Sequence, residues 1–484
     1  MTPVLTAGGL LTTVETIVAF CYLLAAAGFV VGLHLMNSPA TARRGNQVSA
    51  AGMVLAVAAT LAQVIDSRVI TSTGWIVLAA GGLVGAAIGM RSALTIKMTA
   101  VPQLVSLFNA VGGGAAALVA LGDFVHLTTI SPASIGPRTM VSTMLDVIIG
   151  AITFSGSLIA AGKLQGWVTG NPVVFPGARL LNAALAAVAV AGGGYLVSGS
   201  TSAFVLMIVV VAALGLGVLA VLPIGGADMP VVISLLNSMT GTAVAMAGFV
   251  IDNTGLIIAG ALVGASGAIL TKLMADAMNR SIRNIVLGGF GTAGNAVVTS
   301  TGAGGDVRQL SVEDVAIQLL YASKVIVVPG YGLAAAQAQR EVRDLEVLLE
   351  AEGVDVSFAI HPVAGRMPGH MNVLLADANV PYTSLKEMDE VNPEFAQADV
   401  ALVIGANDVV NPAARRPGNA VSGMPILDVD YARNIIVIKR SMGQGYAGID
   451  NELYTDPKTG MFFADAKAGL AAIVAAVKSL IATG

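Results

Sequence analysis

Apolar residues dominate the first 270 positions of this 484-residue chain, and polar residues become frequent only after them. Residues 1–270 hold 14 of the 54 charged side chains (25 basic plus 29 acidic), and residues 271–484 hold the remaining 40. An apolar stretch of about 20 residues is long enough to cross a bilayer as a helix. The pattern predicts nine membrane helices, at residues 12–35, 48–65, 74–90, 101–121, 139–161, 179–197, 202–222, 229–250 and 254–275.

After residue 308, short apolar runs alternate with amphipathic segments, which is typical of a doubly wound parallel sheet. Buried strands are predicted at 324–328, 356–360, 400–404 and 435–438, and helices at 333–351, 371–379 and 464–480. We therefore expect a polytopic α-helical membrane domain at 1–275, a linker at 276–307, and an α/β Rossmann-like domain at 308–484.

Basic residues predict the orientation, because the cytoplasmic loops of membrane proteins are enriched in Lys and Arg. With the N-terminus outside, only Arg68 and Arg138 fall on the outer side, and nine basic residues fall inside: Arg43, Arg44, Arg91, Lys97, Lys163, Arg179, Lys272, Arg280 and Arg283. The C-terminal domain is thus expected in the cytoplasm. The first apolar run has no basic segment before it and is expected to be a retained span, not a cleaved signal.

The composition argues against several classes of protein. Mean hydropathy is +0.81 with 11 % charged residues, which excludes an ordinary soluble protein. Residues 308–484 hold 14 basic and 21 acidic side chains, so no nucleic-acid partner is expected. Cys21 is the single cysteine, and the four histidines are scattered, so neither a metal site nor a haem is expected.

The strand at 324–328 runs into a Gly-x-Gly-x-x-Ala turn, which is typical of a dinucleotide site. Gly330 allows the sharp exit from the strand, Gly332 is expected to let the backbone approach a pyrophosphate, and Ala335 allows close packing of helix and strand. The phosphates would then meet free N–H groups at a helix N-terminus.

The residues that follow two of the predicted strands favour NADP over NAD as the ligand. A site for NAD usually places an acid after the second strand to hold the ribose 2′-OH, but here His361 and Pro362 follow that strand. The run 439–441 (Lys-Arg-Ser) follows the last predicted strand and suits a 2′-phosphate. A solvated strand end is the alternative for this basic pair.

Two further loops carry polar groups. The segment 361–370 is rich in Gly and Pro and offers Arg366 to a phosphate. Asn407 and Asp408 follow a buried strand directly, at the edge where ligands bind to such sheets. Capping of the next turn is the alternative role for Asp408.

Polar side chains within the predicted spans are costly unless they find a partner or line a path. Asn109, Asp146 and Asn237 lie within spans, and Asp228 lies at the inner mouth of the eighth. Hydrogen bonding between helices is the alternative for the asparagines, and a solvated helix cap for Asp228. A proton or ion path would use Asn109, Asp228 and Asn237.

Taken in order, these segments resemble the beta subunit of proton-translocating nicotinamide nucleotide transhydrogenases, over nearly the whole chain. The resemblance is carried by residues 226–230 (Gly-Ala-Asp-Met-Pro), 235–238, 330–332, 361–375, 405–408, 439–442 and 445–448. It implies NADP(H) on this chain and NAD(H) on a separate alpha subunit or pair of subunits, in a dimer of alpha–beta units in the bacterial inner (plasma) membrane. It implies direct, Re/Si-specific hydride transfer from NADH to NADP⁺, coupled to inward proton movement. Such transfer requires positioning of the rings and no acid or base.

The resemblance also implies roles for particular residues. Arg366 would contact the pyrophosphate, Lys439, Arg440 and Ser441 the 2′-phosphate, and Tyr446 would lie on a loop that folds over the nucleotide. Asp408 would take part in a proton-sensitive change in nucleotide grip and is the one catalytic residue expected. The other expected contacts are Gly330, Tyr331, Gly332, Ala335, Val363, Ala364, Gly365, Gly405, Asn407 and Gly445.

One departure from the family concerns the proton path. Family members place a histidine where this chain has Asn109 or Asn237, and an asparagine cannot carry a proton. We expect the partner subunit to supply the histidine, with both asparagines orienting water. Residues 288–305, rich in glycine, are expected to be a hinge. Two alternatives are an ion channel or transporter regulated by a nucleotide-binding cytoplasmic domain, and a quinone- or haem-linked oxidoreductase.

Overall fold

The computed structural model describes residues 13–483 except 37, 69, 98–99, 131–135, 171, 226–227, 279–281, 283–306, 366–368, 418, 420 and 446. Nine described helices are long and apolar enough to cross a membrane, which confirms the predicted spans. They are α1 (Thr13–Leu35), α2 (Pro39–Ser67), α3 (Ser72–Thr95), α4 (Val101–Ile130), α5 (Pro137–Gln165), α6 (Ala178–Val197), α7 (Ala203–Val221), α8 (Met229–Val250) and α9 (Thr254–Ala277).

Several of these helices are longer than their predicted apolar stretches, α2 and α4 by the most. α2 begins nine residues before its predicted start, and α4 ends nine residues after its predicted end. The added residues of α2 include Arg43 and Arg44, and those of α4 include Asp123 and His126. Hydropathy finds only the part of a helix that suits hydrocarbon, whereas the backbone hydrogen bonds continue into the interface.

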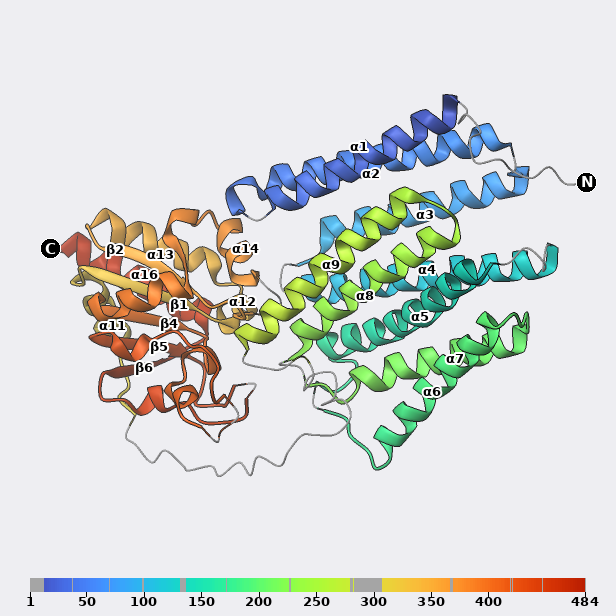
Figure 1. The fold of residues 1–484 in the computed structure, drawn as a ribbon. Helices are drawn as coiled ribbons and strands as arrows, with labels where there is room; N and C mark the ends of the chain where they lie inside the picture. The colour runs from blue at the N-terminus through green and yellow to red at the C-terminus, as the bar shows by residue number, and fades with distance from the viewer. Residues whose placement is uncertain are drawn as a thin grey trace, which may run out of the picture.

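The helices α4, α5, α7, α8 and α9 pack closely through small residues. A Cβ added to Gly150 of α5 would lie 3.0 Å from the Cβ of Ala117 on α4, and one on Gly264 of α9 would lie 3.2 Å from Thr242 Oγ1 on α8. Small residues allow this approach in a bilayer, where packing replaces the hydrophobic effect between helices. α1 and α2 form a separate pair beside this group (Figure 1).

The C-terminal domain is a six-stranded parallel sheet in the order β3-β2-β1-β4-β5-β6, which confirms the predicted fold class. The strands are β1 (Lys324–Pro329), β2 (Asp355–Ile360), β3 (Leu385–Glu387), β4 (Val400–Ile404), β5 (Asn434–Lys439) and β6 (Thr459–Phe463). β1 and β4 are buried on both faces, as expected for central parallel strands. The prediction missed the edge strands β3 and β6.

Helices cover both faces of the sheet (Figure 1). They are α11 (Val312–Leu320), α12 (Tyr331–Ala336), α13 (Gln339–Ala351), α14 (His370–Asp377), α15 (Met388–Val391) and α16 (Ala466–Thr483). The prediction of one helix over 333–351 was wrong, because Gln337 adopts a left-handed conformation (φ 54°) and ends α12. α11 was also missed, although Ser311 and Asp314 form a capping box at its start.

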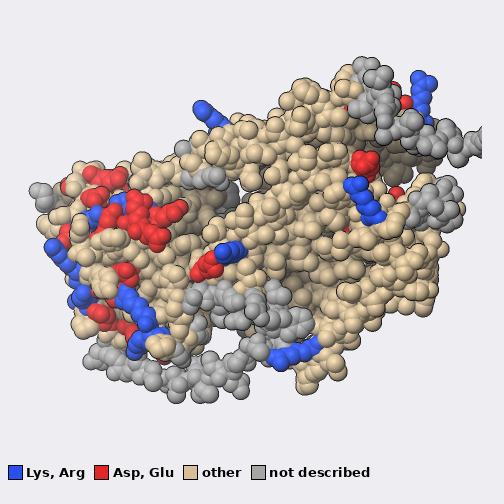
Figure 2. Space-filling view, viewed as in Figure 1, with Lys and Arg blue, Asp and Glu red and all other residues tan. Residues whose placement is uncertain are grey.

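Charged side chains gather over the C-terminal domain, while the visible flank of the helices is almost free of them (Figure 2). This surface matches the change of composition along the chain. The predicted linker at 276–307, with the hinge at 288–305, falls mostly outside the described residues, so both it and the domain boundaries stay predictions.

Candidate functional site

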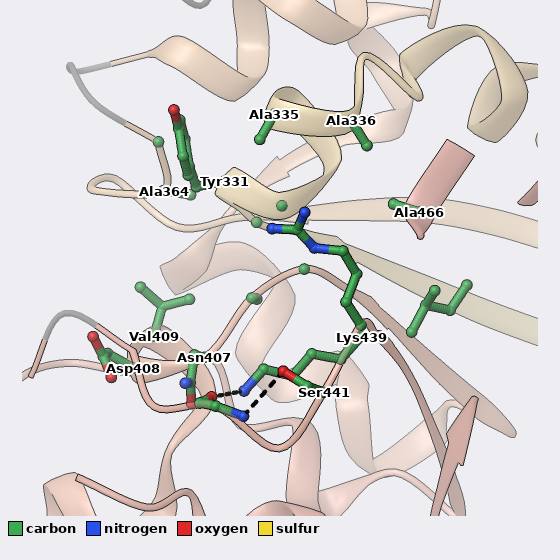
Figure 3. A pocket seen from close by; sticks show the side chains of 18 of the residues that line it. Tyr331, Ala335, Ala336, Ala364, Asn407, Asp408, Val409, Lys439, Ser441 and Ala466 are labelled. Carbon is green, nitrogen blue, oxygen red and sulfur yellow. Dashed lines mark hydrogen bonds between the residues drawn. The ribbon is translucent and has the colours of Figure 1, made fainter. Parts of the chain in front are cut away.

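A cavity of about 410 Å³ opens at the carboxyl edge of the sheet. Its walls come from the segments that follow β1, β2, β4, β5 and β6. Ligands of open α/β sheets bind at this edge, and the size is within the range of small-molecule sites. Tyr331 and Ala335 of α12 face it from one side, and Asn407, Lys439 and Ser441 from the other (Figure 3).

The turns after β1 and β4 touch through backbone atoms. The Gly330 N–H donates to Ile404 O (2.9 Å), and the Gly332 N–H donates to Gly405 O (2.9 Å). A Cβ on Gly332 would lie 2.6 Å from Gly405 Cα, and Gly405 itself has φ +64°. The sequence interpretation of Gly332 was thus incomplete: its missing side chain admits the neighbouring turn, and its N–H is already used.

Lys439 ends β5 and is held in place at the cavity wall. Its Nζ donates to Gly443 O and lies 4.6 Å from the centre of the Tyr454 ring. Burial lowers the pKa of Lys439, and the negative charges of Asp408 and Asp450 oppose this shift. Lys439 is therefore half-buried beside acids, and not a solvated strand end, whereas Arg440 and Ser441 are exposed and line the same cavity.

Asp408 ties the loop after β5 to the end of β4. Its Oδ2 accepts a hydrogen bond from the Ala447 N–H (3.0 Å), and a Cβ on Gly445 would clash with its carboxylate. The cap of the next turn comes instead from Asn411, whose side chain accepts from the Ala413 N–H (3.1 Å). A carboxylate that bonds to a backbone N–H 39 residues away fixes a long-range contact, not a local turn.

Asn407 joins the same cluster. Its amide oxygen faces the Gly445 N–H (2.6 Å) and Lys439 Nζ (3.3 Å), and its amide nitrogen faces the Tyr454 hydroxyl (3.1 Å). The Tyr454 hydroxyl donates to Ala406 O (3.0 Å), and burial raises the pKa of this phenol. The half-buried Asn407 and the buried Tyr454 thus form a polar floor beneath Lys439.

The loop after β2 is built around a neutral histidine. His361 is 2 % exposed; its Nδ1 accepts from the Val363 N–H (3.2 Å) and its Nε2 donates to Pro425 O (2.8 Å). Burial lowers the pKa of His361, because the imidazolium form would lose its hydration. Gly365 has φ +108° and packs against His370, so Val363, Ala364 and Gly365 reach the cavity.

The structure brings most of the predicted site residues to one cavity. Those that line it are Gly330, Tyr331, Gly332, Ala335, Val363, Ala364, Gly365, Gly405, Asn407, Asp408, Lys439, Arg440 and Ser441. Gly445 packs on Asp408 behind the wall, and Arg366 and Tyr446 lie outside the described residues. The sequence interpretation missed nine lining residues: Ala336, Ala406, Val409, Ile438, Gly443, Gln444, Ala464, Asp465 and Ala466. The last three could have been found only by recognising β6.

Of the predicted polar residues of the membrane helices, Asn109 joins α4 to α8. Asn109 Nδ2 donates to Ile233 O (3.3 Å), and Thr240 Oγ1 donates to Asn109 O (3.2 Å). Asn237 lies one helical turn after Ile233 and is half-buried. Asp228 immediately precedes α8 without capping it through its side chain. Within the described residues, no group of three or more His, Cys, Asp or Glu side chains could hold a metal.

Comparison with known proteins identifies relatives over almost the whole chain. The family model described as NAD(P) transhydrogenase beta subunit matches residues 18–476. Two curated relatives, both NAD(P) transhydrogenase subunit beta from Rhodospirillum rubrum and one of them from a named strain, are each 50 % identical over 454 residues. The match covers 92 % of this chain and 96 % of each relative.

Proposed function

Because the chain belongs to the NAD(P) transhydrogenase beta subunit family, we propose that it binds NADP(H) in the cavity at the sheet edge and works with an alpha subunit that binds NAD(H). Hydride passes directly between the two nicotinamides, in Re/Si-specific fashion, while a proton moves inward through the helices. One observation carries this proposal: the cavity has a basic cluster after β5 and no acid after β2.

The basic cluster supports a particular end of the nucleotide. Lys439, Arg440 and Ser441 follow β5, and β5 is separated from β1 by β4. They offer one ammonium, one guanidinium and one hydroxyl to a 2′-phosphate, which is a fitting set of donors. We infer that the adenosine end of NADP(H) lies beside β4 and β5, on the side of the sheet away from β2.

Bound NADP⁺ supplies the hydride acceptor, and NADH on the alpha subunit supplies the hydride. The hydride carries both electrons of the C4–H bond that breaks, and a new C4–H bond forms on the other ring. No side-chain acid or base is required. The residues of this chain bind and orient the nucleotide and exclude water, and Arg366 and Tyr446 are proposed to complete its enclosure.

Asp408 is proposed to make the grip on NADP(H) sensitive to protons. Its carboxylate holds the loop that follows Lys439 through the Ala447 N–H. Its negative charge also raises the pKa of Lys439 and so stabilises the charged form of that side chain. Protonation would weaken both interactions and loosen the loop.

The membrane arrangement supports an inner-membrane protein with a partner. With the C-terminal domain in the cytoplasm, nine basic residues of the loops and helix ends fall inside and two outside, in agreement with the positive-inside rule. α3 has no buried residue, and Gly81, Gly85 and Gly89 on it have nothing within 4 Å. Glycines at this spacing suit the close approach of another helix, so we propose that the alpha subunit covers α3 and that two alpha–beta units form the enzyme.

A channel or transporter regulated by a nucleotide is the second class. The sequence feature that supports it is the segment Pro329-Gly330-Tyr331-Gly332, which resembles a potassium filter. That segment is the end of β1 and the start of α12, and its glycines pack on the turn after β4. Gly330, Tyr331 and Gly332 line the cavity at the sheet edge, so we do not favour a channel or transporter.

Reconstitution tests the proposal. The chain alone should bind NADPH at least about 100-fold more tightly than NADH, because the cationic cluster loses its anionic partner in NADH. In vesicles with the alpha subunit, NADPH should reduce an NAD analogue while a pH-sensitive dye reports proton movement. Equal binding of the two nucleotides would contradict the cofactor assignment, and ion flux without nucleotide oxidation would support the channel.

A further inference from the structure

Asp146, on α5, is a fully buried acid in the membrane part of the molecule. Its exposed fraction is 0 %, and neither carboxylate oxygen has a hydrogen-bond partner among the described residues. Several other buried polar side chains of these helices have partners, namely Ser106, Asn109, Ser155, Ser234 and Thr271. Asn182 and the Ser157 hydroxyl share the lack of a partner among the described residues, but neither group carries a charge. An ionised carboxylate without a partner costs several kcal/mol in such surroundings, so this position needs an explanation.

The side of α5 on which Asp146 lies faces α4. Four and seven residues after Asp146 come Gly150 and Thr153, which share its helix face. Gly150 packs on Ala117 of α4, and a Cβ on Gly113 of α4 would lie 2.9 Å from Thr153 Cβ. At 1.5 Å per residue, Asp146 lies about 14 Å from the start of α5, within the outer half of the membrane.

Polar side chains continue from this seam toward the cytoplasmic end. Ser157, fully buried on α5, accepts a hydrogen bond from Ser106 of α4 at its carbonyl (2.8 Å), and its hydroxyl has no partner among the described residues. Asn109 follows Ser106 on α4 and bonds to α8 at Ile233. These hydrogen bonds connect α4 to α5 and α4 to α8.

Further polar side chains connect α8 to α9. Ser234 of α8 donates to Gly267 O (3.2 Å), and Thr271 Oγ1 of α9 donates to Ser234 Oγ (3.2 Å). Thr271 lies six residues before the end of α9, on the cytoplasmic side in the proposed orientation. Polar side chains thus line the helices from Asp146 to the inner end of the group.

The surroundings of Asp146 hold few other ionisable groups. α7 and α8 have none, α4 has only Asp123 and His126, both near its outer end, and α6 has Arg179 and Tyr195. On α5 itself, Arg138 lies at the outer end, and Lys163 at the inner end donates to Leu222 O and Ile224 O. Of the acids on these five helices, Asp146 is the one that is fully buried.

We propose that Asp146 is the proton-binding group of the membrane path, an inference that rests on the proposed proton translocation. An O–H bond of a hydronium ion on the outer side breaks, an O–H bond forms on the carboxylate, and water is left behind. The new O–H bond breaks in turn when the proton passes along water toward Ser157, Asn109 and Thr271, and the accepting water becomes hydronium. The carboxyl of Asp146 gives this chain a titrating group in the membrane, which Asn109 and Asn237 cannot supply.

Three variants in vesicles with the alpha subunit test this. Asp146→Asn, nearly isosteric but unable to titrate, should lower proton uptake and NADPH-driven reduction of an NAD analogue by about 100-fold. Its binding of NADPH should stay unchanged, and Asp146→Glu should regain much of the turnover. The control is Asp123→Asn on α4, which should behave like the original chain. Proton uptake by Asp146→Asn equal to that of the original chain would overturn the proposal.

Infrared spectroscopy gives a readout that does not depend on turnover. Between low and high pH, the original chain should show a protonated-carboxyl band that Asp146→Asn lacks and Asp123→Asn keeps. Absence of any difference attributable to Asp146 would overturn the assignment, even if the enzyme is active. If the original chain moves no hydride with its alpha subunit, the proposed function fails, whereas the infrared band still decides whether Asp146 binds a proton.

Discussion

Lys439 shows how one cation can be prepared for an anionic ligand. Its ammonium lies over the Tyr454 ring, donates to Gly443 O and faces the Asn407 amide oxygen. Burial lowers its pKa, while Asp408 and Asp450 help to retain its charge. The side chain is therefore fixed before a ligand arrives, which reduces the entropy lost on binding.

Replacing Lys439 by Ala should weaken NADPH binding by about tenfold to 100-fold, because a hydrogen bond to a charged group contributes roughly 1.5–3 kcal/mol. NADH binding should change much less. The matched control is Lys458→Ala, since Lys458 bonds to Asp430 O away from the cavity. Calorimetric titration of both nucleotides measures the difference, and an equal loss for NADPH and NADH would argue against a contact with the 2′-phosphate.

His361 should make the stability of the C-terminal domain depend on pH. Burial holds its pKa below the ordinary value of about 6.5, so the unfolded chain binds the proton more readily than the folded chain. The stabilising contribution of the neutral imidazole is complete above about pH 6.5 and is lost as the pH falls below it. Thermal unfolding between pH 5 and 8 should show this loss in the original chain, and a weaker dependence in His361→Asn.

The control for this experiment is His34→Asn, since His34 is exposed at the end of α1. It should keep the pH dependence of the original chain. The same slope in His361→Asn would mean that another group titrates.

At the scale of elements, the site depends on the contact between the turns after β1 and β4. Gly332 and Gly405 meet through backbone atoms with no room for a side chain. The two strands pair in register from Val325–Val400 to Pro329–Ile404, so any displacement of the turns would disturb the ladder as well. The glycines thus fix the relative position of Tyr331 on one wall and Asn407 on the other.

Gly332→Ala should destabilise this pair of strands by about 3 kcal/mol, because its Cβ would meet backbone and not a movable side chain. Hydrogen exchange of the β1 and β4 amides in the purified chain measures the effect. Gly353→Asn is the control: Gly353 has φ +86° but nothing within 4 Å, and Asn tolerates that conformation. It should cost less than about 1 kcal/mol, and an equal cost for both would mean that strain, not space, governs Gly332.

At the scale of the whole molecule, the helices touch the nucleotide domain near the site. Leu270, Leu273 and Met274 of α9 and the segment containing Pro362 and Val363 line one small cavity of about 270 Å³. Val363 also lines the cavity at the carboxyl edge of the sheet. A movement of α9 would therefore displace the loop after β2. This contact couples the membrane helices to the C-terminal domain.

Asn109→Leu should lower proton-coupled turnover, because it removes the hydrogen bond from α4 to Ile233 in the polar seam. NADPH binding should not change, since the cavity lies in the other domain. The control is Thr128→Val, whose hydroxyl bonds only to carbonyls of α4 itself. Dye-reported proton uptake with the alpha subunit measures the difference, and turnover at the level of the original chain would exclude a role for Asn109.

The sequence by itself determined the nine spans, four of the six strands, the class of the C-terminal domain and most of the cavity residues. Local patterns suffice for these, because lipid requires continuous apolar runs and a parallel sheet requires buried strands followed by glycine turns. The edge strands β3 and β6 escaped because they are short or contain Thr and Gly, and pair only when a neighbouring strand is present.

Only the tertiary structure decided what the side chains contact. Asp408 bonds to Ala447, 39 residues away, the Gly332 N–H is used by the turn after β4, and Asp146 is left fully buried without a partner in the described residues. These facts depend on which helices and turns meet, and packing between distant segments leaves no local pattern in the sequence. The residue types were therefore predictable, whereas their partners and the cost of their burial were not.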